Sequence, residues 1–152
     1  MKVALAADHG GFRLKGVLAE FLSARGFEVI DLGATVLEPD DDYPDFARAA
    51  AKAVREGRAE RGIIICGSGV GASVAASKFP GVRAAVCHDS YSAHQGVEHD
   101  DLNILCLGER VVGTELAKEV AARFLEARFS GAERHRRRLG KIADIEKEFL
   151  RT

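Results

Sequence analysis

A cysteine followed by a glycine-rich loop is the part of this sequence whose residue types most clearly indicate chemistry. Cys66 ends the apolar run 62–66 and starts the segment 66–71, which reads Cys-Gly-Ser-Gly-Val-Gly. Glycines let backbone N–H groups converge on a bound anion, and a helix that begins in the loop directs the positive end of its dipole at the same point. A helix N-terminus also favours the thiolate form of a nearby cysteine. We therefore predict an anion-binding loop with Cys66 as a base or nucleophile at its mouth.

The spacing of this loop argues against two familiar phosphate-binding loops. A thiol phosphatase loop has an arginine six residues after its cysteine, where this chain has Ala72, and a Walker-type loop needs a lysine that 71–73 lacks. The dinucleotide pattern G-x-G-x-x-A is met by Gly67, Gly69 and Ala72. Asp89 follows the next apolar run, where a ribose-binding acid is expected. Nucleotide binding therefore stays open as an alternative, as does a tight turn with a buried thiol.

Apolar periodicity predicts the scaffold that positions this loop. Strand-like runs alternate with stripes of helical spacing, and the predicted strands are 2–7, 27–32, 62–66, 82–87 and 103–107. Five such alternations with short connections indicate an α/β fold, with three α/β/α layers, a doubly wound Rossmann-like five-stranded parallel sheet and a C-terminal helix. Such sheets bind ligands at the carboxyl ends of their strands. We expect that edge to collect Asp8 and His9, the Cys66 loop, His88 and Asp89, and Arg110, with His99 also on the ligand side.

Length and composition limit the classes of protein that fit. The chain has 152 residues, 47% of them hydrophobic, which predicts one domain spanning 1–152. A net charge of −1 gives no overall attraction to nucleic acid or to an anionic membrane. The apolar run 3–7 is too short for a signal peptide, and no stretch approaches the roughly 20 apolar residues of a membrane span, so we expect a cytoplasmic protein. Cys66, Cys87 and Cys106 form no CxxC pair and are predicted to be reduced thiols, two of them in the core.

Two charged segments stand out between the predicted elements. The acidic segment 38–44 is predicted to be a surface loop with solvated aspartates, although Tyr43, at a helix entry, could lean over a neighbouring site. The basic run 134–138 lies at the predicted start of the final helix, where positive charge opposes the helix dipole unless an anion such as phosphate answers it. A solvated basic face is the alternative, and nucleic acid is disfavoured because no aromatic residues interleave the run. The final segment 139–150 has an apolar stripe, Leu139, Ile142, Ile145 and Phe149, which indicates an interface.

Several separated motifs, in one order along nearly the whole chain, carry a resemblance to a known family. They are Asp8-His9-Gly10-Gly11-Phe12 with Lys15, Asp42-Tyr43-Pro44, Cys66-Gly67-Ser68-Gly69-Val70-Gly71, Tyr91-Ser92-Ala93, Glu98-His99, Gly108-Glu109-Arg110-Val111-Val112-Gly113, Arg134 and Arg138. With these motifs the chain resembles the type B ribose-5-phosphate isomerases and their galactose- and allose-6-phosphate isomerase relatives. The resemblance implies interconversion of an aldose phosphate and a ketose phosphate through a cis-enediolate, without a metal or nucleotide cofactor.

The same resemblance implies a role for individual residues. Cys66 would be the base, His99 would open the sugar ring, and Ser68 stands in the catalytic loop where the family usually has threonine. The substrate-binding residues implied in this way are Asp8, His9, Tyr43, Gly67, Ser68, Gly69, Val70, Gly71, Asp100, Arg110, Arg134 and Arg138. Among them, His9 and the three arginines would hold the phosphate, with Arg134 and Arg138 reaching in from a second subunit. A homodimer with shared active sites, or a tetramer of such dimers, follows from that arrangement.

Two departures from the family pattern bear on the substrate. Asp100 replaces the asparagine that commonly follows the ring-opening histidine, and a carboxylate would repel an enediolate oxygen to which an amide can donate. The segment 93–97 is also less basic than is usual at this place. Ribose 5-phosphate is the expected substrate, and allose 6-phosphate, galactose 6-phosphate and a tetrose phosphate stay open. A non-catalytic nucleotide- or phosphate-binding module is the alternative from a different class, but it explains neither Cys66 nor the basic run.

Overall fold

A parallel five-stranded sheet forms the centre of the fold. The computed structural model describes residues 1–149, so Leu150 of the predicted last segment and 151–152 of the predicted domain lie outside the described residues. The strands are β1 (Lys2–Ala7), β2 (Glu28–Asp31), β3 (Arg61–Cys66), β4 (Ala84–Val86) and β5 (Ile104–Gly108), and they lie in the order β2-β1-β3-β5-β4. Every pair is parallel. The predicted doubly wound α/β architecture is confirmed.

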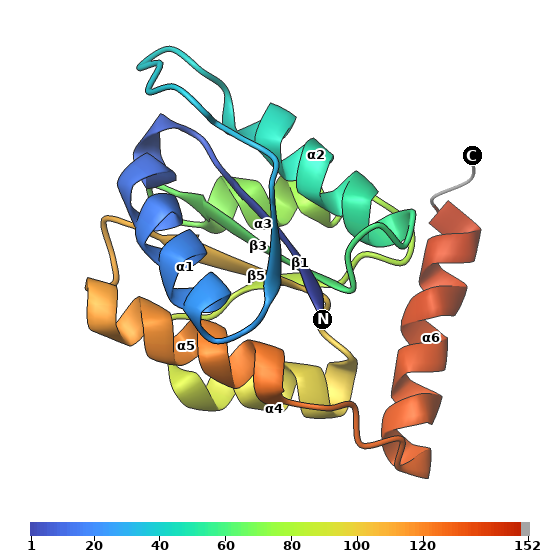
Figure 1. The fold of residues 1–152 in the computed structure, drawn as a ribbon. Helices are drawn as coiled ribbons and strands as arrows, with labels where there is room; N and C mark the ends of the chain where they lie inside the picture. The colour runs from blue at the N-terminus through green and yellow to red at the C-terminus, as the bar shows by residue number, and fades with distance from the viewer. Residues whose placement is uncertain (150–152) are drawn as a thin grey trace.

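Helices cover both faces of the sheet (Figure 1). On one face lie α1 (Phe12–Ala24), α4 (Ser90–Asp100) and α5 (Thr114–Glu126), and on the other lie α2 (Tyr43–Arg55) and α3 (Val70–Ala76). Side chains of β3 alternate between the two cores, since Ile63 and Ile65 pack under the first set of helices and Ile64 under the second. This alternation explains why the run of three isoleucines is a central strand rather than part of a helix. A 3-10 turn, His9–Gly11, connects β1 to α1.

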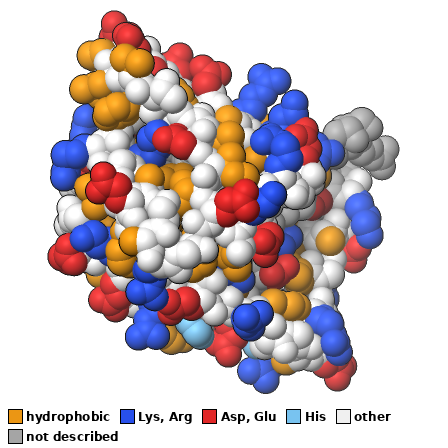
Figure 2. Space-filling model, in the orientation of Figure 1, with side chains coloured by type: hydrophobic (Ala, Val, Ile, Leu, Met, Phe, Trp, Pro, Cys, Tyr) orange, Lys and Arg blue, Asp and Glu red, His pale blue; other side chains and the backbone are white. Residues whose placement is uncertain are grey.

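The last helix, α6 (Glu133–Phe149), stands away from the sheet and packs against the end of α4 (Figure 1). Its lower part is held by His135, which is buried, and farther along Glu146 accepts a hydrogen bond from the backbone N–H of Gly81 at 3.0 Å. Basic side chains follow the helix over its exposed surface (Figure 2). The apolar stripe is largely uncovered, with Ile145 58% and Phe149 72% exposed. Within residues 1–149, the apolar face of α6 is therefore largely exposed to solvent.

Two glycines bring the loops of the carboxyl edge close together. A Cβ on Gly11 would lie 2.5 Å from the backbone of Ile65, so α1 can start against β3 only because this position has no side chain. Gly69 has φ of +81° and a Cβ there would lie 3.0 Å from the backbone of Leu107. The glycine-rich loop is thus pressed onto the ends of β3 and β5.

The edge strand β4 is shorter than predicted. The pattern predicted 82–87, whereas the observed strand spans only Ala84–Val86. It pairs with β5 on one side, and just before it the side chain of Asn103 accepts the N–H of Arg83 at 2.8 Å. Among residues 1–149, none of the helices combines the length and apolar character that crossing a membrane requires.

Candidate active site at the carboxyl edge of the sheet

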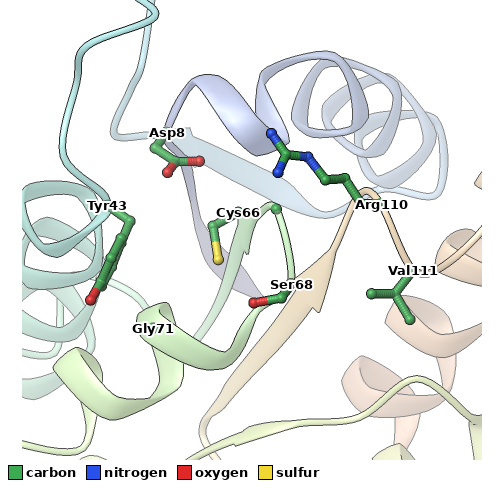
Figure 3. Close-up of a pocket in the computed structure, with 8 residues that line it drawn as sticks. Asp8, Tyr43, Cys66, Ser68, Gly71, Arg110 and Val111 are labelled. Atoms are coloured by element: carbon green, nitrogen blue, oxygen red, sulfur yellow. The ribbon is translucent and has the colours of Figure 1, made fainter.

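A pocket of about 300 Å³ opens at the carboxyl ends of β1, β3 and β5 (Figure 3). It is lined by Asp8, Tyr43, Cys66, Gly67, Ser68, Gly71, Arg110 and Val111. Seven of these were predicted from the sequence to hold or convert the substrate, and they come from segments up to a hundred residues apart. The prediction that the ligand-binding edge collects the Cys66 loop with Asp8 and Arg110 is confirmed. Val111 was not predicted, although it directly follows Arg110 in the same turn.

Cys66 ends β3 with its thiol directed into this pocket (Figure 3). The residue is 5% exposed, and Sγ accepts a hydrogen bond from the backbone N–H of Gly69 at 3.0 Å. That donor faces the atom that carries the negative charge when a thiol acts as a base. Gly69 can present its N–H in this way because the left-handed φ at this position bends the loop back over the sulfur. Val70 follows as the first residue of α3.

The other two cysteines belong to the core, as predicted. Cys87 and Cys106 are buried and all three cysteines are free thiols. Burial away from water raises the pKa of both core thiols, most strongly for Cys106. Cys66 lines the pocket, whereas Cys87 and Cys106 do not. The choice of Cys66 as the candidate for chemistry therefore agrees with the geometry.

Asp8 has both a structural and a pocket-facing role. Its Oδ1 accepts the N–H of Gly10 at 2.9 Å and so caps the turn before α1. The side chain also lines the pocket beside Cys66, and the residue is 6% exposed. Burial raises the pKa of this carboxyl group. Asp8 is placed to accept or donate a hydrogen bond to a polar ligand.

The prediction that the aspartates of the acidic loop are solvated is wrong for Asp41. Its Oδ1 accepts the backbone N–H of His9 at 2.9 Å and lies 2.6 Å from Nδ1 of the same histidine. The hydrogen bond to this carboxylate raises the pKa of His9. The sequence contains one weak indication that Asp41 lies near the site, because it is two residues before Tyr43, which lines the pocket. Spacing alone could not pair Asp41 with a residue 32 positions away.

The side-chain donor atoms of Asp8, His9 and Asp41 lie close enough together to hold a metal ion. One donor atom from each lies within 4.8 Å of the others. The hydrogen bond between Nδ1 of His9 and Asp41, however, is the contact expected of a protonated ring nitrogen, which has no lone pair for a metal. The arrangement fits a hydrogen-bonded cluster of charges better than a coordination site.

His99 does not lie at this edge, contrary to the expectation that it sits on the ligand side. It is near the C-terminal end of α4, and the chain enters β5 at Ile104, so His99 lies by the amino end of a strand whose carboxyl end reaches the pocket. A strand of this length separates the two ends by roughly 13 Å. The ring of His99 stacks on the ring of His135 at 4.1 Å, and its Nδ1 is 2.8 Å from the amide nitrogen of Gln95.

The remaining predicted ligands lie with His99 rather than with Cys66. Asp100 ends α4, while Arg134 and Arg138 are exposed on the first two turns of α6. These two arginines are four residues apart and thus share one face of the helix. His135 lies between them, and its burial lowers its pKa. Within one chain the predicted site residues therefore form two groups, one at each edge of the sheet.

Asp89, the candidate ribose-binding acid of the nucleotide alternative, has another role. Its carboxylate accepts the N–H of Ser92 at 2.7 Å and caps α4. Its neighbour His88 accepts the N–H of Gly108 at 2.9 Å. Neither residue lines the pocket. This placement counts against a dinucleotide lying across the glycine loop.

Comparison with known proteins gives matches over nearly the whole chain. The family model described as Ribose/Galactose Isomerase matches residues 3–142. The putative sugar phosphate isomerase YwlF of Bacillus subtilis is 45% identical, covering 99% of this chain and 100% of its own. Ribose-5-phosphate isomerase B of Escherichia coli is 47% identical, covering 95% and 96%. D-erythrulose-4-phosphate isomerase of Pectobacterium atrosepticum is 37% identical, covering 86% of each chain.

Solved structures agree with the sequence matches. Ribose-5-phosphate isomerase B of Clostridium thermocellum has a TM-score of 0.95 and 52% identity, covering 98% of this chain and 99% of its own. The enzyme of the same name from Mycoplasma genitalium, solved with bound ribulose 5-phosphate, has a TM-score of 0.92 and 40% identity, covering 97% of each chain. At these identities the match extends beyond the fold to the family.

Proposed function

The chain belongs to the ribose/galactose isomerase family and is an aldose–ketose sugar-phosphate isomerase, and from this premise we propose that it interconverts ribose 5-phosphate and ribulose 5-phosphate. The observation that carries the proposal is the Cys66 thiol, which faces the pocket under the N–H of Gly69 and beside Arg110. Relatives named for ribose 5-phosphate reach 47% and 52% identity, against 37% and 39% for the two relatives named for D-erythrulose 4-phosphate. That difference supports the pentose as the substrate.

The pocket supports the steps of this reaction in order. The Cys66 thiolate would take the proton from C2 of the open-chain aldose, while the electron pair moves through the new C1–C2 double bond onto the carbonyl oxygen. Backbone N–H groups between Gly67 and Gly71, with the hydroxyl of Ser68, would donate to the cis-enediolate. The C2 hydroxyl proton would pass to the C1 oxygen, the resulting thiol would return its proton to C1, and the C2 oxygen would become the ketone oxygen. Asp8 and Tyr43, which line the same pocket, would hold sugar hydroxyls beside the thiol.

We further propose a homodimer, or a tetramer of such dimers, in which His99, Asp100, Arg134 and Arg138 of one subunit complete the pocket of the other. All four lie away from the pocket of their own chain. In the partner's pocket His99 would open the furanose ring, and the two arginines would join His9 and Arg110 around the phosphate. The exposed apolar face of α6 supports this assembly, because the stripe that includes Ile145 and Phe149 needs a covering surface.

A substrate panel tests the proposed function directly. The protein is incubated with ribose 5-phosphate, allose 6-phosphate, galactose 6-phosphate and D-erythrulose 4-phosphate, and the aldose–ketose change is followed for each. We expect the highest kcat/KM with ribose 5-phosphate. A higher value with another sugar phosphate would overturn the choice of substrate. A parallel fluorescence titration with NADH tests the nucleotide alternative, and NADH binding without turnover of any sugar phosphate would overturn the isomerase mechanism.

A further inference from the structure

We propose that Asp41 is a positioning residue for His9, which it holds in one orientation and in the cationic form that binds the phosphate group of the substrate. The proposal rests on the proposed function, since the phosphate contact of His9 is part of it. Asp41 lies in the loop between β2 and α2, and His9 lies in the turn after β1. Nothing in the family resemblance assigns a role to Asp41, because the shared motif begins at Asp42.

The contacts of Asp41 orient the whole His9 residue. A single oxygen, Oδ1, meets both the backbone N–H at 2.9 Å and Nδ1 of the ring at 2.6 Å. Two contacts to one residue restrict both its backbone and its ring torsion. With Nδ1 engaged by the carboxylate, Nε2 is the ring nitrogen left to donate to a ligand. The ring is also close to Asp8, which lines the pocket.

Within the described part of the chain, the second oxygen of Asp41 contributes no hydrogen bond to the fold of the loop. Oδ2 is buried, and it has no hydrogen-bond partner among residues 1–149. A buried polar atom without a partner destabilises the folded state, and a charged one does so more strongly. An asparagine would keep the Oδ1 contacts and remove the charge from this buried position. The carboxylate is therefore better explained by its effect on His9 than by loop stability.

Three charged groups act on the His9 ring, and they come from three separate segments. Asp41 has the largest effect and raises the pKa of His9 through its hydrogen bond, and Asp8 on the preceding residue raises it further by charge. Arg110, after β5, opposes them. A sugar phosphate is a dianion near neutral pH, so a cationic His9 beside Arg110 would present two positive groups to it. Removing the charge of Asp41 would leave the ring neutral over more of the working pH range.

The test compares the variants Asp41→Asn and Asp41→Ala with Asp40→Asn as the matched control. Asp40 is exposed in the same loop, so its variant loses the same charge without touching His9. The titration of the His9 imidazole is followed by NMR in the free protein, with its signal assigned by its loss in His9→Gln. We expect the titration of His9 to move to lower pH in Asp41→Asn and to stay unchanged in Asp40→Asn.

Kinetics and binding give the functional half of the same test. With ribose 5-phosphate near pH 8, KM should rise about tenfold in Asp41→Asn with kcat changed by less than about twofold, because a charge-assisted contact to the non-reacting phosphate is weakened. The decline of kcat/KM at high pH should begin at lower pH than in the wild type. Asp41→Ala should raise KM further, since the ring also loses its anchor. Thermal stability of Asp41→Asn should be equal to or above that of the wild type.

The outcomes separate this proposal from the proposed function. If His9 titrates at the same pH in Asp41→Asn as in the wild type, the control by Asp41 is overturned whatever the activity. If the titration moves but KM and the affinity for inorganic phosphate do not, the phosphate part is overturned. If the wild type turns over no ribose 5-phosphate, the proposed substrate fails. The His9 titration and the binding of inorganic phosphate still decide the role of Asp41 in that case.

Discussion

Replacing Gly71 with alanine should damage the pocket while leaving the fold intact. Gly71 lies in the first turn of α3 and faces the ring of Tyr43 (Figure 3). A Cβ at this position would lie 2.6 Å from Cζ and 2.7 Å from Cε2 of that ring, well inside van der Waals contact. The ring would have to move by roughly 1 Å to restore an ordinary contact. Tyr43 is 40% exposed at the start of α2, so its side chain can swing outward without disturbing the core.

The size of the effect follows from what that displacement does to a positioning group. Misplacing such a group by about 1 Å can reduce the rate by up to about 100-fold. Losing one hydrogen bond to a sugar hydroxyl weakens binding by about 1 kcal/mol. We therefore expect kcat/KM for ribose 5-phosphate to fall by about 10- to 100-fold, or about 1.4 to 2.7 kcal/mol. Alanine in a helix is favoured over glycine by up to about 1 kcal/mol, so the free energy of unfolding should not fall.

The assay combines kinetics, thermal unfolding and a double-mutant cycle. Gly16→Ala is the matched control, because Gly16 lies in α1 and a Cβ there would meet nothing within 4 Å. That control should keep the wild-type kcat/KM. On a Tyr43→Ala background, Gly71→Ala should add almost nothing, since the ring it displaces is already gone. Wild-type kcat/KM in Gly71→Ala, or losses that simply add in the double variant, would refute the steric reasoning.

Three further predictions address the assigned roles. Cys66→Ser should bind ribose 5-phosphate but lose turnover by about a thousandfold, because a hydroxyl is a far weaker base; retained turnover would remove Cys66 from the mechanism. His99→Ala should be damaged more on ribose 5-phosphate than on an acyclic four-carbon sugar phosphate, and equal losses would contradict a role in ring opening. Mixing Cys66→Ser with Arg138→Ala should restore about a quarter of the wild-type activity after subunit exchange, since half the dimers are mixed and each has one intact site. Failure with exchange confirmed by native mass spectrometry would place Arg138 in the same chain as its pocket.

The sequence could predict the sheet because its strongest signals are local. Three consecutive isoleucines bounded by a glycine loop need only short-range periodicity to be read as a buried strand, and the pocket then follows from the rule for the carboxyl edges of parallel sheets. The end of β4 was less predictable. Val82 and Cys87 are as apolar as the strand residues 84–86, but an edge strand pairs only where its one partner, β5, lies alongside.

The contact between Asp41 and His9 could not be predicted, because it depends on how a long loop folds back over the sheet. Three consecutive aspartates, 40–42, have nearly the same local surroundings in the sequence, yet one is exposed, one bonds to His9 and one precedes α2. From composition alone, all three aspartates are predicted to be solvated. Only the tertiary position of the loop distinguishes them, and the start of the loop is held by backbone hydrogen bonds of Gly33 and Ala34 with Ala7 at the end of β1.

The placement of His99 bears on whether one copy of this fold could carry out the proposed reaction alone. In a parallel sheet each helix returns the chain from the carboxyl edge to the amino edge, so residues at the end of α4 must lie a full strand length from Cys66. No rotamer spans that distance, and moving α4 would unpack Ala93 and Val97 from the core. His99 instead stacks on His135 in the first turn of α6, and Arg134 and Arg138, on either side of His135 in the sequence, are exposed on that helix. If Cys66 and His99 act on one sugar, the pocket must be completed by a second copy, and the uncovered apolar side of α6 is the surface we expect that copy to contact.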